Sequence, residues 1–313
     1  MKKISIIIPM YNEEAIVKEC YERIKNVFEN IEKYEYEMIF IDDGSNDKTL
    51  EILNTIANIN NQVKVISFSR NFGHQAAIIA GIKYVTGDAC IIIDGDMQDP
   101  PEVIPQMIKL WEDGNEVIYG KRKKREGESI FKLLSAKMFY DILNNLSDIE
   151  IPKDTGDFRL VDKKVIDVIN ILPEHNKFLR GLFSWVGFKQ KSFEYDRGKR
   201  KKGKTKYNLR QMSSLALDGV FSFNSKPLKF VGFLGIILII VSICMFIYLF
   251  LVHLLKFKLV GFGVGYAFIT FVSGIQLFSI WVLAEYVVRI YVETRKRPEY
   301  IVDRFINLEK YEK

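Results

Sequence analysis

Short apolar runs alternate with helical stretches along the first part of the chain. Runs rich in Ile, Val and Phe predict buried strands at residues 3–9, 37–41, 63–67, 89–93 and 116–119. The stretches between them predict helices at about residues 11–33, 48–58, 74–85 and 101–112. Because strands and helices alternate through short loops, we expect an α/β domain with a mostly parallel, doubly wound sheet.

Two long uncharged runs follow, at about residues 230–255 and 259–284. Each is long enough to cross roughly 30 Å of hydrocarbon as a helix. Lys and Arg crowd the outer flanks of this pair, whereas the loop between the runs offers Lys256 and Lys258. The positive-inside bias then predicts a transmembrane hairpin with both ends in the cytoplasm. The first apolar run stops at Pro9, too early for a signal peptide, so we expect the α/β domain in the cytoplasm too.

We therefore expect four segments in the 313 residues. The α/β domain covers residues 1–204, and an amphipathic segment at 205–227 lies in the membrane interface. The two transmembrane helices fall within residues 228–290, and a cytoplasmic tail covers 291–313. An ordinary core-packing helix would explain the mixed polar and apolar pattern of the second segment equally well.

Charge and cysteine content narrow the classes of partner and compartment. The net charge of +6 includes a basic block at residues 197–206. Nucleic-acid binding is one interpretation, but no aromatic platform or nucleic-acid fold accompanies the block. Attraction to anionic lipid headgroups, or to a lipid phosphate, explains it better, and no nucleic-acid partner is expected. Cys20, Cys90 and Cys244 have neither metal nor redox spacing, which fits a reduced cytosolic setting.

Acidic side chains follow the carboxyl ends of the first, second and fourth predicted strands, as Glu13, Asp42, Asp43, Asp94 and Asp96. Because ligands bind at this edge of open α/β sheets, we expect these side chains on one rim. Asp94, Asp96 and the amide oxygen of Gln98 are hard ligands suited to Mg²⁺ or Mn²⁺ holding a diphosphate, although a solvated acidic turn has the same pattern. No dinucleotide-binding glycine fingerprint follows the first strand, and no P-loop is present.

A series of ordered motifs extends over nearly the whole chain. They are SIIIPMYNEE at 5–14, IDDGSND at 41–47, SRNFGHQ at 69–75, IDGDMQDPPE at 93–102, YGKR at 119–122, REGES at 125–129, TGDFRL at 155–160, FLRGL at 178–182, KTKY at 204–207 and EYVVRIY at 285–291. Together they resemble the inverting family 2 glycosyltransferases of GT-A fold, in the dolichol-phosphate-mannose-synthase-like branch. Within that branch they are most similar to the bacterial bactoprenol (undecaprenyl-phosphate) glucosyltransferases.

The resemblance implies a Rossmann-like nucleotide-diphospho-sugar transferase domain with its donor in the amino-terminal half. The residues that would bind the donor nucleotide are Pro9, Tyr11, Glu13, Asp42 and Asp94. Carboxylates suit uracil N3–H and ribose hydroxyls, because they accept hydrogen bonds. Asp94, Asp96 and Gln98 would hold Mg²⁺ or Mn²⁺ against the diphosphate, which neutralises charge on the departing group. For Asp42 and Asp43, a turn-capping pair is the alternative.

Asp157 occupies the family position usually assigned to the catalytic base, and Asp96 is the second residue that we expect in catalysis. A lipid phosphate has a second pKa of about 6 and needs little deprotonation. Asp157 would then orient the acceptor or stabilise positive charge at the anomeric carbon. A surface aspartate paired with Arg159 is the remaining alternative. His74 has two open roles, a contact to the donor phosphates or capping at a helix end.

The resemblance places the acceptor phosphate near a loop that enters a helix. The residues concerned are Arg122, Arg125 and Ser129, with Lys204 closing over the phosphate from the basic block. Guanidinium groups and a helix amino terminus suit a phosphate monoester. A solvated charged loop is the alternative for the two arginines.

The expected function is that of a metal-dependent inverting enzyme that transfers a hexose, foremost glucose from UDP-glucose, to undecaprenyl phosphate at the cytoplasmic face, for cell-envelope glycan modification. UDP-N-acetylglucosamine, UDP-galactose and GDP-mannose stay open as donors, and the family suggests a homo-oligomer, a tetramer. A processive polysaccharide synthase is the first rival, but its Gln-x-x-Arg-Trp motif is missing. A non-catalytic membrane scaffold is the second, and the intact Asp94, Asp96 and Asp157 argue against it.

Overall fold

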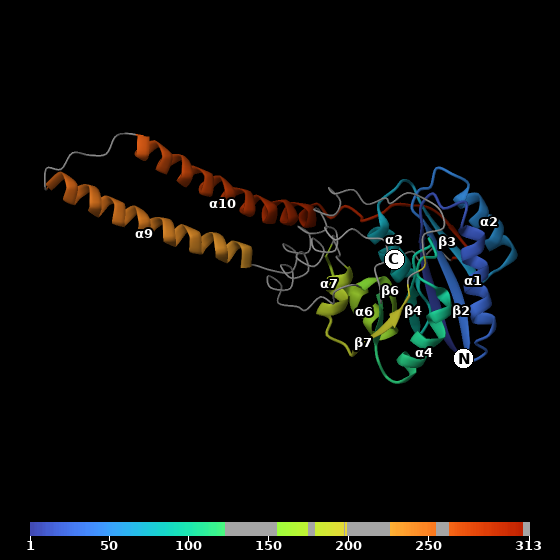
Figure 1. Cartoon of the computed structure of the whole chain (residues 1–313). Coiled ribbons are helices and arrows are strands. Elements are labelled where there is room, and N and C mark those ends of the chain that lie inside the picture. The colour runs from blue at the N-terminus through green and yellow to red at the C-terminus, as the bar shows by residue number, and fades with distance from the viewer. Residues whose placement is uncertain (123–154, 175–178, 197, 199–225, 255–262, 309–313) are drawn as a thin grey trace.

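The computed structural model describes residues 1–122, 155–174, 179–196, 198, 226–254 and 263–308. Figure 1 shows an α/β domain from which two long helices extend. In chain order the elements are β1 (Lys2–Met10), α1 (Val17–Glu29), β2 (Tyr34–Asp42), α2 (Thr49–Ile59), β3 (Val63–Phe68), α3 (His74–Tyr84), β4 (Ala89–Ile92), η1 (Pro101–Val103), α4 (Ile104–Glu112), β5 (Val117–Arg122), β6 (Thr155–Asp162), α6 (Lys163–Ile171), α7 (Leu179–Trp185), β7 (Gln190–Tyr195), α9 (Lys226–Leu254), α10 (Gly263–Arg295) and β8 (Val302–Ile306).

The strands form one mixed sheet in the order β7-β5-β6-β4-β1-β2-β3-β8. The four central strands, β4, β1, β2 and β3, are parallel, as the alternation of strands and helices predicts. The prediction of a mostly parallel sheet is confirmed, because β5 and β7 also pair in parallel, but two strands run the other way. β6 lies between β4 and β5 and is antiparallel to both, and β8 is antiparallel to β3. Two charged residues interrupt the apolar pattern of β6, namely Asp157 and Arg159, and both are buried.

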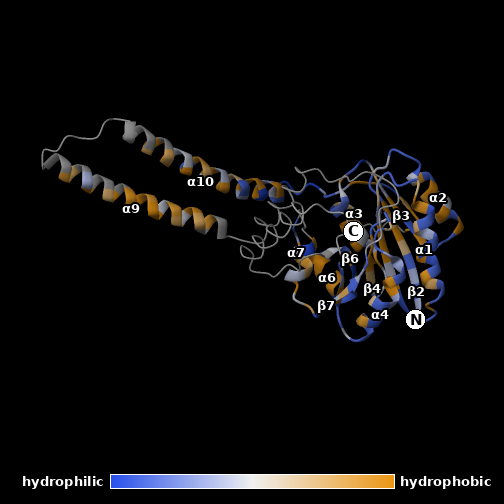
Figure 2. Cartoon of the chain, in the orientation of Figure 1, coloured by the Kyte–Doolittle hydropathy of each residue, from blue (hydrophilic) through white to orange (hydrophobic). Residues whose placement is uncertain are grey.

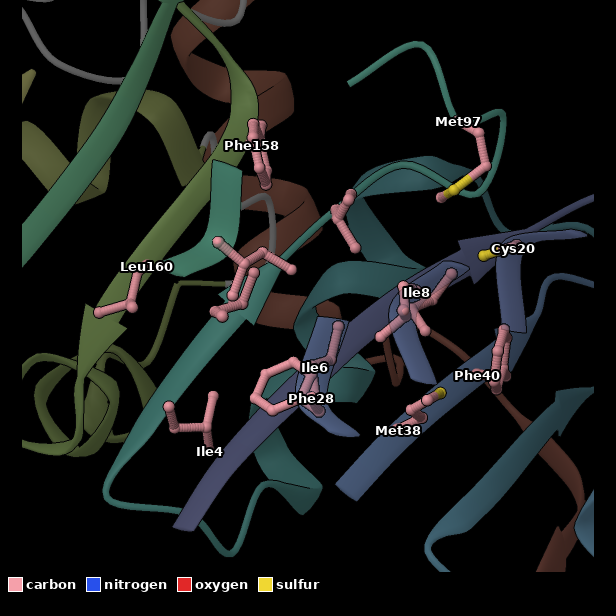
Figure 3. Packing of buried hydrophobic residues seen from close by; sticks show 14 of the residues in the cluster. Ile4, Ile6, Ile8, Cys20, Phe28, Met38, Phe40, Met97, Phe158 and Leu160 are labelled. Carbon is pink, nitrogen blue, oxygen red and sulfur yellow. The ribbon is translucent and has the colours of Figure 1, made fainter. Parts of the chain in front are cut away.

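Helices cover both faces of the sheet, so the doubly wound arrangement is confirmed. On β1, Ile6 and Ile8 pack into the core that α1, α2 and α4 complete, whereas Ile7 faces the core beneath α3, α6 and α7. Figure 3 shows the first of these cores, with Phe158 and Leu160 of β6 on the same side. Because side chains alternate along a strand, Asp157 must lie on the other side, toward α3 and α7.

Helices α9 and α10 occupy the two long apolar runs and lie side by side, away from the sheet. Figure 2 shows apolar residues along most of both helices and polar ones where α10 approaches the α/β domain. Among the described residues, one helical stretch, Phe271–Arg295, is long and apolar enough to cross a membrane, and Phe230–Val241 is a shorter apolar helix. This finding suggests membrane association. That both helices cross the membrane stays a prediction.

The segment expected as a tail, residues 291–313, contains the last turn of α10 and then β8. β8 pairs with the edge of β3, and the Tyr300 ring stacks on Phe68 at 4.9 Å between centroids. The side-chain amide of Asn307 donates to the carbonyl groups of Ala57 and Val63, at 2.7 and 2.9 Å. Asp303 and Arg304 interrupt the apolar pattern of β8, so the sequence alone does not indicate this strand.

Candidate active site

The loops after β1 and β2 lie against each other at one rim of the sheet. The register pairs the last residue of β1, Met10, with Asp42 at the end of β2. Beyond this pair, the amide of Asn12 donates to the Ser45 hydroxyl at 2.9 Å, and the Asn12 side chain accepts from the amide of Asn46 at 2.8 Å. The carboxyl ends of β1 and β2 therefore lie together at this rim, as the sequence predicts.

Asp42 and Asp43 have different partners. The Asp42 carboxylate accepts from the amide of Ser45 at 3.3 Å and from the Ser67 hydroxyl at 3.1 Å. Burial raises the pKa of Asp42 above its usual value, which these two hydrogen bonds only partly offset. Asp43 accepts from two consecutive backbone amides, at 2.6 and 2.9 Å, in the turn that begins α3. Asp43 is thus a capping residue for that turn.

The other residues predicted for the nucleoside lie along the end of β1. Pro9 is buried within β1, and Tyr11 and Glu13 are half-buried in the loop that follows. The backbone of Glu13 is fixed, because its amide donates to the Thr49 hydroxyl at 2.9 Å. This loop and Asp42 belong to the same rim.

The segment from Asp94 to Asp99 forms a tight turn after β4. Met97 has φ 53°, a left-handed conformation that costs free energy for a residue with a side chain, and such residues concentrate at functional sites. A side chain at Gly95 would crowd β1, because a Cβ there would lie 2.8 Å from Met10 Cε and 3.0 Å from the carbonyl oxygen of Pro9. The Asp96 carboxylate accepts from the amide of Gln98 at 3.1 Å.

Two contacts from the end of β7 hold this turn. The Tyr195 hydroxyl donates to the Asp99 carboxylate at 2.5 Å, in a buried position. The amide of Gly198 donates to the carbonyl oxygen of Gln98 at 2.9 Å. Gly198 belongs to the basic block at residues 197–206. This described residue of the block therefore contacts the turn that bears the acidic pair, Asp94 and Asp96.

A cluster of charged side chains lies next to this turn. Arg180 donates from Nε and Nη2 to the two oxygens of Asp157, at 2.8 and 2.9 Å. His74 Nε2 lies 3.3 Å from Asp157 Oδ2 and 3.4 Å from Asp94 Oδ1. The alternative of a surface aspartate paired with Arg159 is wrong, because Asp157 is 6% exposed and its partner is Arg180. Arg159 instead donates to the carbonyl groups of residues 156 and 157.

The charges of the cluster shift one another's pKa values. Burial alone would raise the pKa of Asp157, but Arg180 and His74 hold it well below its usual range. Burial alone would lower the pKa of His74, but Asp94 and Asp157 raise it to about 9. Burial raises the pKa of Asp94 to about 6, which His74 only partly offsets. At neutral pH the cluster therefore holds a protonated imidazole, a guanidinium and an ionised Asp157.

The acidic pair fits a divalent cation that shares its ligands with a diphosphate. Asp94 Oδ1 is buried and accepts no hydrogen bond, and its contact with His74 Nε2, at 3.4 Å, is an ion pair, which leaves a hard oxygen for a cation. In the described part of the chain, no group of three or more His, Cys, Asp or Glu side chains is arranged to hold a metal ion by itself. Mg²⁺ commonly takes one or two carboxylates and completes its shell with water and substrate phosphates. Asp94 and Asp96 match that donor set.

The predicted acceptor residues are only partly within the described chain. Arg122 is the last residue of β5, and Arg125, Ser129 and Lys204 lie outside the described residues. Sequence reasoning gave no role to Arg180, although the motif FLRGL at 178–182 contains it. Its partner Asp157 is 23 residues away in the chain, so only the fold brings the two together.

Known proteins resemble this chain over most of its length. The family model described as glycosyl transferase family 2 matches residues 5–169. The uncharacterized glycosyltransferase YkcC of Bacillus subtilis is 47% identical over 97% of this chain and 94% of its own length. The prophage bactoprenol glucosyl transferase homolog of Escherichia coli is 39% identical, over 96% of this chain and 99% of its own. The bactoprenol glucosyl transferase of Shigella phage SfX is 38% identical, over 96% and 98%.

Solved structures are more distant. Glucosyl-3-phosphoglycerate synthase from Mycobacterium tuberculosis, in complex with Mn²⁺, uridine diphosphate and phosphoglyceric acid, is 17% identical over 70% of this chain and 76% of that chain, with a TM-score of 0.49. TarS 1–349 of S. aureus is 18% identical over 65% of this chain and 59% of that chain, with a TM-score of 0.41. At these values the two likenesses carry no argument about the site.

Proposed function

Because this chain belongs to glycosyl transferase family 2, we propose that it transfers glucose from UDP-glucose to undecaprenyl phosphate at the cytoplasmic face of a membrane. The observation that carries the proposal is the near-full-length similarity to proteins named as bactoprenol glucosyl transferases. The product would be a polyprenyl-phosphate sugar, used in cell-envelope glycan modification.

The donor half of the proposal rests on the rim of the sheet. Pro9, Tyr11 and Glu13 would contact the nucleoside, and the buried carboxylate of Asp42 would accept a hydrogen bond from the base or ribose. Asp94, Asp96 and Gln98 would bind Mg²⁺ or Mn²⁺ together with the diphosphate. The bound cation supplies charge neutralisation for the departing nucleoside diphosphate.

The proposal of a phosphate acceptor rests on the hydrogen bonds and the protonation state of Asp157. Both oxygens of its carboxylate already accept hydrogen bonds from Arg180, and its pKa is held low, so it is a poor proton acceptor. An alcohol acceptor would need a base, whereas a phosphate monoester is largely dianionic at neutral pH, because its second pKa is about 6. The charged cluster therefore favours a phosphate acceptor.

The reaction would be a single in-line displacement with inversion. A phosphate oxygen of the acceptor forms a bond to the anomeric carbon while the bond from that carbon to the diphosphate breaks, and the electron pair leaves with UDP. No covalent enzyme intermediate is needed. The bonds and charges balance without a proton transfer, which agrees with the occupied Asp157.

The membrane half of the proposal places α9 and α10 across the bilayer as a hairpin. Large apolar side chains on both helices are exposed, for example Phe233, Ile236, Phe271 and Leu277. Basic residues flank the outer ends of the pair, which by the positive-inside bias puts the α/β domain in the cytoplasm. A polyprenyl phosphate would then present its headgroup on the same side as the rim.

The test uses the purified full-length protein with undecaprenyl phosphate, Mn²⁺ and one donor at a time. The donors are UDP-glucose, UDP-N-acetylglucosamine, UDP-galactose and GDP-mannose, and the lipid product is identified by mass. We expect glucosyl phosphoryl undecaprenol from UDP-glucose and loss of product in Asp96→Ala. Product from another donor alone would correct the sugar, and no product from any donor would refute the transfer. Full activity of Asp96→Ala would refute the metal site.

A further inference from the structure

Arg180 has a fixed position that the proposed reaction does not by itself explain. It lies at the start of α7, between anchors that are almost fully buried: Leu179, Leu182 and Phe183 are 1%, 1% and 2% exposed. These three side chains belong to the core beneath α6 and α7. The carbonyl of Phe183 also accepts a hydrogen bond from the side-chain amide of Gln190 at 2.7 Å. The core thus sets where the guanidinium group can reach.

The backbone that bears Asp157 is fixed from the same helix. Arg159 is 4% exposed and donates to the carbonyl oxygen of Gly156 at 3.0 Å and to that of Asp157 at 3.3 Å. Its guanidinium carbon lies 4.4 Å from the centre of the Phe183 ring. One arginine therefore holds the main chain at Asp157, and the other holds its carboxylate.

We propose that Arg180 is a positioning residue, whose two parallel hydrogen bonds fix the orientation of the Asp157 carboxylate beside the acidic turn that begins at Asp94. A bidentate pair between guanidinium and carboxylate fixes the plane of the carboxylate as well as its distance, which a single charge such as Lys cannot do. His74 contacts the same carboxylate from α3, at 3.3 Å. Asp157 is then a fixed negative charge at the reaction centre.

A purely stabilising ion pair is the alternative, and the position of the pair argues against it. Removing two charges from water offsets most of their attraction, so a buried ion pair is weak evidence for a gain in stability. The pair also lies within reach of His74 and Asp94, beside the turn that follows β4. We therefore expect Arg180 to affect the chemical step.

The inference rests on the proposed function, and the first measurement is steady-state glucosyl transfer. Misplacing a reacting group by a small distance can cost on the order of 100-fold in rate. We expect Arg180→Gln to lower kcat by roughly 30- to 100-fold, to leave the KM for UDP-glucose within about threefold, and to leave the affinity for UDP with Mn²⁺ unchanged. Arg180→Lys should recover only part of the rate.

A double substitution tests whether Arg180 acts through Asp157. Residues that act as a unit are not additive, so Arg180→Gln should lower the rate of Asp157→Asn by less than about threefold. The control is Arg23→Gln, which removes a bidentate pair with Glu102 on an exposed surface and should leave kcat unchanged. Additive losses, or a tenfold weaker affinity for UDP with Mn²⁺ in Arg180→Gln, would overturn the inference.

A stability measurement separates this inference from the proposed function. Arg180→Gln leaves a buried carboxylate without its bidentate partner, so Tm should fall by about 5 °C. Adding Asp157→Asn should recover more than half of that fall, because the unpaired charge is gone. If the wild-type protein transfers no sugar, the proposed function fails. The Tm values of the single and double variants still test the coupling between Arg180 and Asp157. Failure of Asp157→Asn to recover Tm would then overturn the inference.

Discussion

Two carboxylates at opposite ends of the sheet have different surroundings. At the amino end, Glu37 of β2 is 1% exposed and accepts hydrogen bonds from the hydroxyl of Ser5 and the ammonium group of Lys64, both at 2.5 Å. The amide and hydroxyl of Thr86 donate at 2.9 Å, and the ammonium group of Lys3 lies 2.9 Å away. At the carboxyl end, Asp94 has one buried oxygen that accepts no hydrogen bond.

The pKa values follow this difference in partners. Burial alone would raise the pKa of Glu37, but donors on β1, on β3 and in the loop after α3 lower it to about 2. Burial and three neighbouring carboxylates raise the pKa of Asp94 to about 6, which His74 only partly offsets. A carboxylate whose oxygens all accept hydrogen bonds stabilises the fold. A carboxylate with an oxygen that accepts none is available to a ligand. The comparison therefore indicates a stabilising role for the carboxylate at the amino end of the sheet and a ligand-binding role for the one at the carboxyl end.

The largest effect should come from Asp94→Asn, which keeps the shape of the side chain and removes its charge. Loss of a metal ligand should lower the rate of glucosyl transfer by on the order of 1,000-fold, equivalent to about 4 kcal/mol of transition-state stabilisation. The free energy of unfolding should not fall, because the surroundings of Asp94 already favour its neutral form. Transfer assays and urea unfolding of the same preparation measure both. A large loss of stability would contradict the comparison.

The matching change at the other end, Glu37→Gln, should have the reverse outcome. It leaves Lys64, which is 16% exposed, and Lys3 without their counter-ion, and should lower the free energy of unfolding by about 3 kcal/mol. The kcat should stay within about twofold of wild type, because Glu37 is far along β2 from the rim. Glu35→Gln is the control, since Glu35 lies on the same strand and is exposed. A Glu37→Gln protein that is stable but inactive would refute the assignment.

Acid should remove the contribution of Glu37. Its pKa is about 2 in the folded chain and about 4.3 in the unfolded chain, so below pH 4.3 protons bind preferentially to the unfolded state. The contribution is present above that pH and is lost as the pH falls toward 2. The difference in unfolding free energy between wild type and Glu37→Gln should narrow from about 3 kcal/mol at pH 7 to roughly half near pH 3. A constant difference would mean that Glu37 is not ionised in the folded protein.

The local sequence pattern was sufficient to predict which acidic residues lie at the carboxyl-end rim of the sheet. Apolar runs and short loops predict the four parallel strands, and parallel strands place their carboxyl ends together, so Asp42 and Asp94 were expected at one edge. The amino end has no such signal. Glu37 and Lys64 are single charges within apolar strands, and only the pairing of β2 with β3 brings them together.

The remaining misses have the same physical origin. β6 carries Asp157 and Arg159, whose burial depends on partners elsewhere in the chain, and so its pattern does not predict an inserted antiparallel strand. Arg180 reaches Asp157 only because α7 packs on the second core. Such long-range pairs depend on the tertiary fold, which propensity and periodicity do not encode.

The smallest effect should come from the pair of Arg23 and Glu102. It tests whether bidentate geometry without burial is enough to make an ion pair strong. Arg23 donates from Nε and Nη2 to the two oxygens of Glu102, at 2.9 and 2.7 Å, the same arrangement as Arg180 with Asp157. Here the Glu102 side chain is 55% exposed, so water screens the charges. Arg23→Gln should therefore lower the free energy of unfolding by about 0.5 kcal/mol, and by less in 1 M salt, where the Debye length is about 3 Å. Urea unfolding at two salt concentrations measures this. A loss near that of Glu37→Gln would show that bidentate geometry, and not burial, determines the strength of these pairs.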